Sequence, residues 1–251
     1  MFLIRAMATG ACAIAFGGAA YAADDIYYPE SLPPSGHPLY GASSLAGDLT
    51  LVGGLWTGDS SGHYVDAGGR VAIGLGSGWV FQPEVWVGTD SDTFSYIEGV
   101  AHFYRRTPTS AVGGFVGASS YTGGSDWSVG IEAESYAHPN AIVGGRLWYG
   151  DGAFGSWVEA DGWWSYFFNP DLMLTAEGEA WLGSGGVDSG AEGSLTLTKR
   201  FPGTQLAGFL SGWIYHDVGP WTVAGAEVGL RWYFDPPGTT LYDAETKLVA
   251  F

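Results

Sequence analysis

An alternation of apolar and polar side chains recurs in twelve segments of this chain, and it limits the possible folds more than any other feature. Successive side chains of a β-strand point to opposite faces, so residues two apart share a face. In the segment 65–75, Val65 and Leu75 fall on one face, whereas Asp66 and Arg70 fall on the other. Such a period of two is typical of strands and is incompatible with helices.

We predict twelve strands, each roughly 9–14 residues long, which is the length that a tilted strand needs to cross a bilayer. The connections between them alternate between loops that contain aspartate and turns that are tight or rich in proline. A unit of two strands, about 31 residues long, thus repeats six times between Gly47 and Phe234. The predicted strands are 47–57, 63–76, 79–88, 93–105, 110–118, 126–136, 141–150, 156–168, 171–182, 190–199, 205–215 and 221–234.

The two faces of these strands differ in chemistry. One face is almost purely apolar or glycine, with aromatic residues gathered at the strand ends, and the other collects nearly every glutamate. Strands 110–118 and 205–215 are too uniformly apolar for their faces to be assigned. A sheet with lipid on one side and a polar lumen on the other explains both faces. We therefore predict an all-β fold, a closed antiparallel up-and-down transmembrane β-barrel of about 12 strands with short loops on both sides.

Composition excludes several classes of protein. The net charge is −17 with only 9 lysines and arginines, so there is no basic patch for a nucleic acid. An aromatic content of 16% excludes a disordered chain. Cys12 is the only cysteine, and because it lies in a predicted signal peptide, the mature protein is expected to have neither disulfides nor thiolate chemistry.

The ends of the chain carry their own patterns. Arg5, the apolar run 6–20 and the small residues around the 22–23 bond predict a cleaved signal peptide over 1–22. We expect 23–46 to be an extended periplasmic segment, 47–234 to form the barrel and 235–251 to be a periplasmic tail.

The last strand resembles that of outer-membrane β-barrel proteins of Gram-negative bacteria, a porin-like family whose subfamily the sequence does not identify. In that family the final strand ends in alternating hydrophobic residues and an aromatic, and the barrel-assembly machinery recognises it; Val228, Leu230, Trp232 and Phe234 match. The resemblance implies integration in the cell outer membrane, contact with its lipid and lipopolysaccharide, and passage of small solutes. One departure is that the chain continues for 17 residues after Phe234.

Alternation also predicts which residues line the lumen. Twelve acids face inward and only three arginines oppose them, with a histidine as a possible fourth cation, which leaves about nine uncompensated negative charges. The predicted lumen-lining residues are Asp48, Asp66, Arg70, Glu84, Glu98, His102, Glu132, Glu134, Arg146, Glu159, Asp161, Glu177, Glu179, Glu192, Glu227 and Arg231.

Two functions are compatible with such a lumen. An open lumen would favour passive diffusion of small cations, as acidic rings do in pores. A lumen filled by its own side chains would make a non-conducting structural or accessory barrel, for example in envelope maintenance or polysaccharide export. All connections are short, so no long loop is expected to fold inward. An outer-membrane lipid hydrolase is a third alternative, but no serine motif stands near a histidine. We predict no enzyme, cofactor or metal site.

Overall fold

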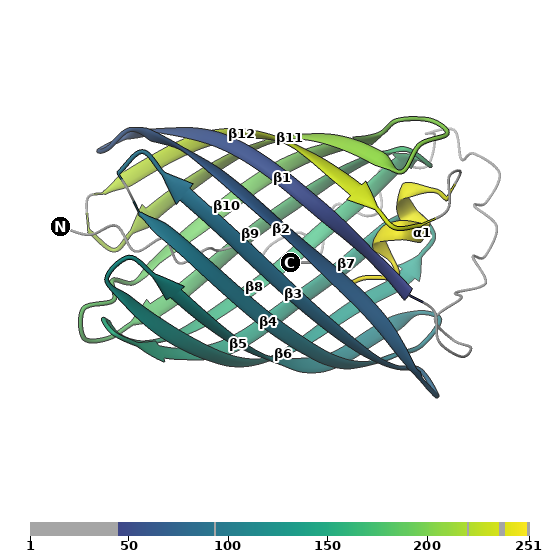
Figure 1. Cartoon of the computed structure of the whole chain (residues 1–251), viewed down its shortest axis with the longest axis horizontal. Coiled ribbons are helices and arrows are strands. Elements are labelled where there is room, and N and C mark those ends of the chain that lie inside the picture. The colour runs from purple at the N-terminus through teal and green to yellow at the C-terminus, as the bar shows by residue number, and fades with distance from the viewer. Residues whose placement is uncertain (1–44, 93, 220, 236–238, 250–251) are drawn as a thin grey trace.

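The computed structural model describes residues 45–92, 94–219, 221–235 and 239–249. Their strands form one closed antiparallel barrel in which each strand pairs with its neighbours in sequence and β1 pairs with β12 (Figure 1). The predicted fold class is therefore confirmed. The strands are β1 (Leu45–Gly58), β2 (Gly62–Gly76), β3 (Trp79–Asp90), β4 (Ser95–Arg106), β5 (Ser110–Tyr121), β6 (Gly124–His138), β7 (Ala141–Gly152), β8 (Gly155–Asn169), β9 (Leu172–Gly183), β10 (Gly190–Arg200), β11 (Leu206–Asp217) and β12 (Thr222–Tyr233).

Each strand begins and ends within three residues of its predicted bounds. The predicted signal peptide 1–22, and all but the last two residues of the segment 23–46, lie outside the described residues. Among the described residues, no helix combines the length and the apolar character needed to cross a membrane.

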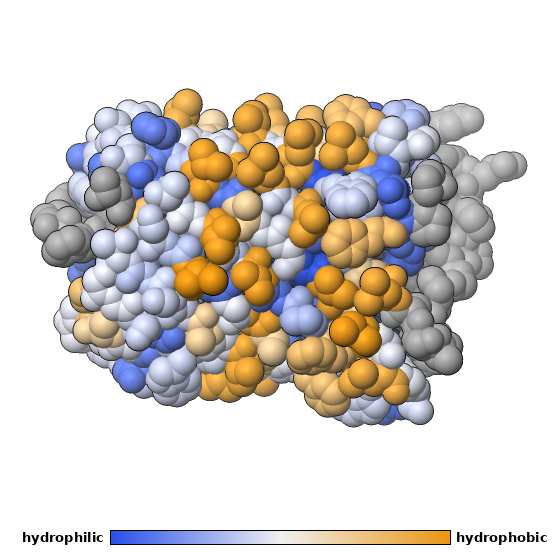
Figure 2. Space-filling view, in the orientation of Figure 1, coloured by the Kyte–Doolittle hydropathy of each residue, from blue (hydrophilic) through white to orange (hydrophobic). Residues whose placement is uncertain are grey.

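Large apolar side chains cover the outer face of the barrel. Along β1, for example, Leu49, Leu51 and Leu55 are exposed, whereas Asp48 and Thr50 are buried. Figure 2 shows these apolar side chains over the middle of the barrel and toward the end that holds the C-terminal helix, while the opposite end is more hydrophilic. A surface of exposed leucine, valine and isoleucine around buried carboxylates suits a hydrocarbon solvent and is the reverse of a soluble protein.

The structure also assigns the two strands whose faces the sequence left open. In β5, Phe115 is buried and Val116 is exposed, and in β11, Ser211 is buried and Leu210 is exposed. Residues with odd numbers therefore face inward in both strands.

Aromatic side chains of the outer face gather near the end where β1 begins and β12 ends, which we call the terminal end. There, Trp79 stacks on Phe103 with ring centroids 4.8 Å apart. The ring centroid of Tyr166 lies 5.7 Å from that of Trp164 and 5.2 Å from that of Phe168. Aromatic rings suit the partly wet edge of a bilayer, so this arrangement is typical of a membrane-interface girdle.

The interior of the terminal end is filled by the C-terminal segment, which we define as residues 239–249. It contains the short helix α1 (Leu241–Glu245), begun by Thr240, whose side-chain oxygen accepts a hydrogen bond from the Asp243 backbone N–H at 3.0 Å (Figure 1). Leu241, Leu248 and Val249 are completely buried in one apolar cluster with inward-facing barrel residues such as Val80, Tyr104 and Phe167.

This placement differs from one expectation. Residues 235–251 were expected to form a periplasmic tail after the barrel, and only the connections between strands were considered as segments that could fold inward. The connections between strands are indeed short, but the described part of the tail packs inside the barrel. Its apolar side chains replace water at the inner wall, which stabilises this position.

Candidate functional site

An elongated cavity of about 470 Å³ lies inside the barrel and is lined by residues from all twelve strands. At the end opposite the terminal end, which we call the loop end, its lining includes Phe94, Phe154 and Trp221. At the other extreme it reaches Glu245 of the C-terminal segment. The cavity thus extends from the loops toward the C-terminal segment, and it is the candidate functional site.

All of the predicted lumen-lining residues face the interior of the barrel. Five of them are partly exposed and line the cavity: Glu98, Glu177, Glu192, Glu227 and Arg231. The other eleven are buried: Asp48, Asp66, Arg70, Glu84, His102, Glu132, Glu134, Arg146, Glu159, Asp161 and Glu179. Four of the buried residues also line the cavity: Asp66, Arg70, Arg146 and Glu159.

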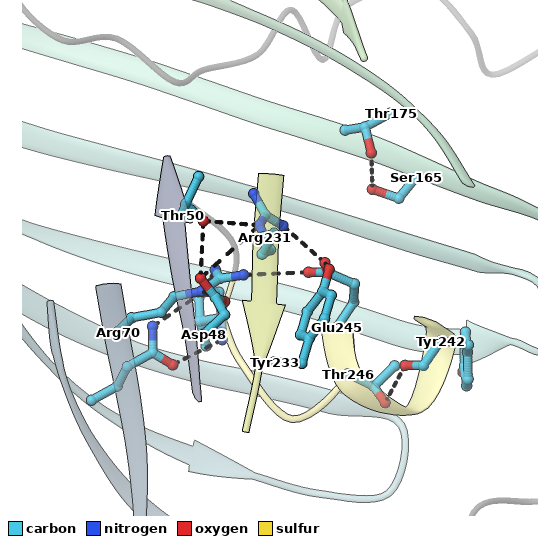
Figure 3. A network of polar contacts seen from close by, with 12 residues as sticks. Asp48, Thr50, Arg70, Ser165, Thr175, Arg231, Tyr233, Tyr242, Glu245 and Thr246 are labelled. Atoms are coloured by element: carbon cyan, nitrogen blue, oxygen red, sulfur yellow. Dashed lines mark hydrogen bonds and ion pairs between the residues drawn. The ribbon is translucent and has the colours of Figure 1, made fainter. Parts of the chain in front are cut away.

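Near the terminal end, the interior charges are paired with one another. Arg70 Nε donates to Asp48 Oδ2 at 2.7 Å, and Arg70 Nη2 lies 3.3 Å from Glu245 Oε2. Glu245 also accepts from Arg231 Nη1 at 2.9 Å and from the Tyr233 hydroxyl, as Figure 3 shows. Two arginines and two carboxylates therefore form one network that ties the C-terminal segment to the barrel wall.

A second set of contacts holds the backbone of the C-terminal segment. The Gln82 amide donates to the Val249 carbonyl at 3.2 Å and accepts from the Val249 N–H at 3.1 Å. The same carbonyl accepts from Arg70 Nη1 at 2.8 Å. Tyr104 donates its hydroxyl to Gln82 Oε1 at 3.0 Å. These completely or nearly buried polar groups are thereby satisfied, as burial requires.

Two buried arginines at this end were not among the predicted lumen residues. Arg106 donates to the Tyr136 hydroxyl at 2.8 Å, and Arg200 Nη1 lies 3.4 Å from the Thr240 carbonyl oxygen. Both are the last residues of their strands, next to a turn. Continuing the alternation from His102 and Tyr104 would have placed Arg106 inside, but proximity to a turn makes the orientation of a strand-end residue hard to predict.

The middle zone holds one cation between aromatic rings. Arg146 Nε donates to Asp161 Oδ2 at 2.6 Å. The guanidinium lies 5.2 Å from the ring centroid of Trp148 and 5.6 Å from that of Trp163. Ion pairing and two cation–π contacts together fix this buried charge. In the same zone, His102 Nδ1 lies 2.8 Å from Glu132 Oε2.

In the middle of the barrel and toward its loop end, hydroxyl groups rather than arginines or lysines hold several carboxylates. Ser119 donates to Asp126 at 2.5 Å and Ser194 donates to Glu177 at 3.3 Å. The Tyr64 hydroxyl donates to Glu227. A hydroxyl group orients a carboxylate without cancelling its charge. The balance of positive and negative side chains therefore differs between the two ends of the cavity. Arginines concentrate toward the terminal end and carboxylates toward the loop end.

Nine inward aromatic rings lie against the wall of the barrel, because each of the nine faces a glycine on a neighbouring strand. A Cβ added at Gly68 would lie 2.3 Å from the Trp86 ring, and one at Gly144 would lie 2.1 Å from the Trp163 ring. The rings cover backbone instead of crossing the lumen, which leaves the cavity open despite its many aromatics. Paired across strands in this way are Gly54 with Tyr64, Gly68 with Trp86, Gly88 with Tyr96, Gly130 with Phe115, Gly144 with Trp163, Gly150 with Trp157, Gly190 with Trp181, Gly225 with Trp213 and Gly229 with Phe209.

Two histidines, His63 and His216, lie near the loop end of the barrel. His216 Nδ1 lies 2.9 Å from the Thr222 hydroxyl, and His63 is exposed. Within the described ranges, no group of three or more histidine, cysteine, aspartate or glutamate residues is arranged to hold a metal ion.

Comparison with known proteins places the chain by its fold. No protein-family model and no curated protein matches the sequence. Among solved structures, the NanC porin is 12% identical with a TM-score of 0.62, and the match covers 73% of this chain and 98% of that one. The KdgM porin is 13% identical with a TM-score of 0.57, covering 74% and 99% of the two chains. An outer membrane channel from Pseudomonas putida F1 is 9% identical with a TM-score of 0.54, covering 80% and 99%. The chain is thus similar in fold to outer-membrane porins.

Proposed function

We propose that this protein is an integral outer-membrane channel through which small solutes diffuse passively, with a preference for cations. The observation that carries the proposal is the cavity, whose wall includes carboxylates that are hydrogen-bonded to hydroxyl groups, such as Glu177 and Glu227. Uncompensated negative charge in a confined lumen attracts cations and repels anions. The similarity in fold to the NanC and KdgM porins supports a channel rather than an enzyme.

The proposal includes a role for the predicted assembly residues. Val228, Leu230 and Trp232 project from the outer face of β12, and Phe234 follows them with its backbone N–H bonded to the Gly47 carbonyl at 2.8 Å. An outward row of apolar side chains that ends in an aromatic is accessible to the barrel-assembly machinery before the barrel closes. The same outer face would contact lipid and lipopolysaccharide in the mature membrane protein.

The C-terminal segment limits this conduit, because it occupies the terminal end of the lumen. The same observation favours a second candidate function, that of a non-conducting structural or accessory barrel. If the protein is a channel, the C-terminal segment narrows the passage. If it is a structural barrel, the segment permanently blocks the lumen.

Single-channel recording in planar bilayers separates these functions. The channel proposal predicts discrete conductance steps and, in a potassium chloride gradient, a reversal potential of the sign given by cation preference. Replacing Glu177 and Glu179 by glutamine should shift that potential toward zero. Asp92→Asn is the matched control, because Asp92 lies in an exposed loop outside the cavity. The complete absence of steps across a range of salts would reject the channel and leave the structural barrel.

A further inference from the structure

Part of the cavity wall near the loop end has the chemistry of a binding site. Five residues make up this part, which we call the aromatic–acidic chamber: Trp157, Glu159, Trp181, Glu192 and Tyr215, contributed by the adjacent strands β8 to β11. Glu159 lies directly across from Trp181, and Glu192 lies directly across from Tyr215. The Trp181 and Tyr215 rings stack with centroids 5.3 Å apart. Carboxylates and ring faces therefore lie side by side along one wall, and the buried Glu179 is directly across from Glu192.

Two polar atoms of this chamber lack hydrogen-bond partners. Glu159 is only 2% exposed; its carboxyl group contacts that of Glu179, and its Oε1 atom has no hydrogen-bond partner. The indole Nε1 of Trp157, two residues earlier on the same face of β8, also has none although it is buried. A buried acceptor that is left unpaired is unfavourable, so a ligand that brings an N–H or a positive charge to Glu159 would be stabilised there.

The barrel already holds one cation in an environment of the same kind. Two indole rings and the Asp161 carboxylate surround the Arg146 guanidinium. This site lies beside the chamber, because Trp148, which contacts the guanidinium, is directly across from Glu159. The chamber repeats the combination of aromatic faces and carboxylates but has no arginine or lysine among its five residues.

We propose that the aromatic–acidic chamber binds organic cations, with the apolar body of an amine or quaternary ammonium compound on the ring faces and the positive nitrogen beside Glu159 and Glu192. Cation–π attraction and charge pairing act on the same group in this arrangement. Neutral saccharides would use the ring faces as well, but they bring no positive charge to the carboxylates of the chamber. The chamber lies within the proposed conduit, so the inference rests on the proposed function for access and deepens it by naming a solute class.

The test measures binding of choline and of its uncharged isostere 3,3-dimethylbutan-1-ol to the full mature chain in detergent, by calorimetry and by tryptophan fluorescence. We expect choline to bind at least about tenfold more tightly than the isostere, since the two differ only in charge. Glu159→Gln and Glu192→Gln should each weaken choline binding by about tenfold or more, whereas Asp92→Asn should leave it unchanged. The comparison of the two ligands needs no variant, so it holds even where a substitution prevents folding.

Each outcome is decisive. Equal affinity for choline and its isostere, or no choline binding, overturns the proposal. Binding of glucose without binding of choline also overturns it and assigns the chamber to neutral saccharides. Because binding is measured without a membrane, failure of choline to bind a conducting protein rejects only the chamber. Choline binding to a protein that gives no conductance steps supports the chamber and rejects the channel.

Discussion

Glu245 accepts a hydrogen bond from Arg231 at 2.9 Å and thereby ties the C-terminal segment to β12, the strand that closes the barrel. The other cation facing Glu245 is Arg70 of β2. Asp48 of β1, the strand that lies between β2 and β12, pairs with Arg70. The network therefore spans the seam between the first and last strands (Figure 3). Because these residues come together only in the closed barrel, the segment can dock fully only after closure.

Replacing Glu245 by glutamine should loosen the C-terminal segment. The amide keeps the shape of the side chain but removes the charge that two arginines face, which should lower the free energy of unfolding by about 1–3 kcal/mol. We expect more frequent transitions between current levels in planar bilayers. Asp243→Asn is the matched control, because its carboxylate contacts Thr240 of its own helix. Identical current traces for the Glu245 variant and the parent protein would show that the network does not restrain the segment.

Ending the chain after Asp235 should widen the lumen. The deletion removes Leu241, Leu248 and Val249 from the interior, where they are completely buried, and exposes Val80 and Tyr104 to water. We expect a conductance several times that of the full chain and a lower unfolding temperature, measured from the heat-induced shift in electrophoretic mobility. If the truncated barrel folds and its conductance equals that of the full chain, the C-terminal segment does not limit passage.

The barrel fold could be predicted from the sequence, because the alternation of apolar and polar side chains in each strand indicates which face contacts lipid and which contacts water. The position of the C-terminal segment could not. Asp243, Glu245 and Lys247 are typical of a solvated tail, and Leu241, Leu248 and Val249 follow neither the period of a strand nor that of a long helix. The contact that decides its position joins Glu245 to Arg70, 175 residues apart in sequence. Only the closed barrel brings these two residues together.

The packing of aromatic rings against glycines could not be predicted from the sequence either. The alternation places Gly68 and Trp86 on the inner face, but only the register between β2 and β3 makes them direct neighbours. The lumen residues were predictable by alternation in mid-strand, for example Glu159 and Asp161, and were missed at strand ends, as Arg106 shows.

Gly68→Ala should reduce conductance by displacing a tryptophan into the lumen. The added Cβ would lie 2.3 Å from the Trp86 ring, so the ring must leave the wall. Such overpacking costs about 1–3 kcal/mol of stability. Gly193→Ala is the control, since its nearest neighbour would be the Glu177 carbonyl oxygen at 3.7 Å, an ordinary contact. Conductance and unfolding are measured for both variants. Equal effects of the two substitutions would contradict the packing of the Trp86 ring against Gly68.

Arg146→Met should destabilise the barrel strongly, because it leaves the buried Asp161 carboxylate without its cation. Breaking a buried pair from one side costs about 3–5 kcal/mol. Adding Asp161→Asn to the same chain should recover a large part of this loss, because the orphaned charge is removed as well. Urea unfolding in lipid vesicles measures both steps. A double variant that is less stable than the single one would show that the charge of Asp161 is satisfied in another way.

Leu51→Arg tests which solvent the outer face meets. Leu51 lies near the middle of β1, is 54% exposed and belongs to the apolar surface of the barrel. In a bilayer, an arginine at this depth should lower the free energy of unfolding by about 2–4 kcal/mol, since the hydrocarbon core cannot solvate its charge. Val218→Arg, in the exposed loop after β11, should change the stability by about 0–1 kcal/mol because water or headgroups reach it. The measurement is reversible unfolding in vesicles. Equal stability of the two variants would mean that water, and not lipid, surrounds the middle of the barrel. This result would contradict the assignment of a transmembrane barrel.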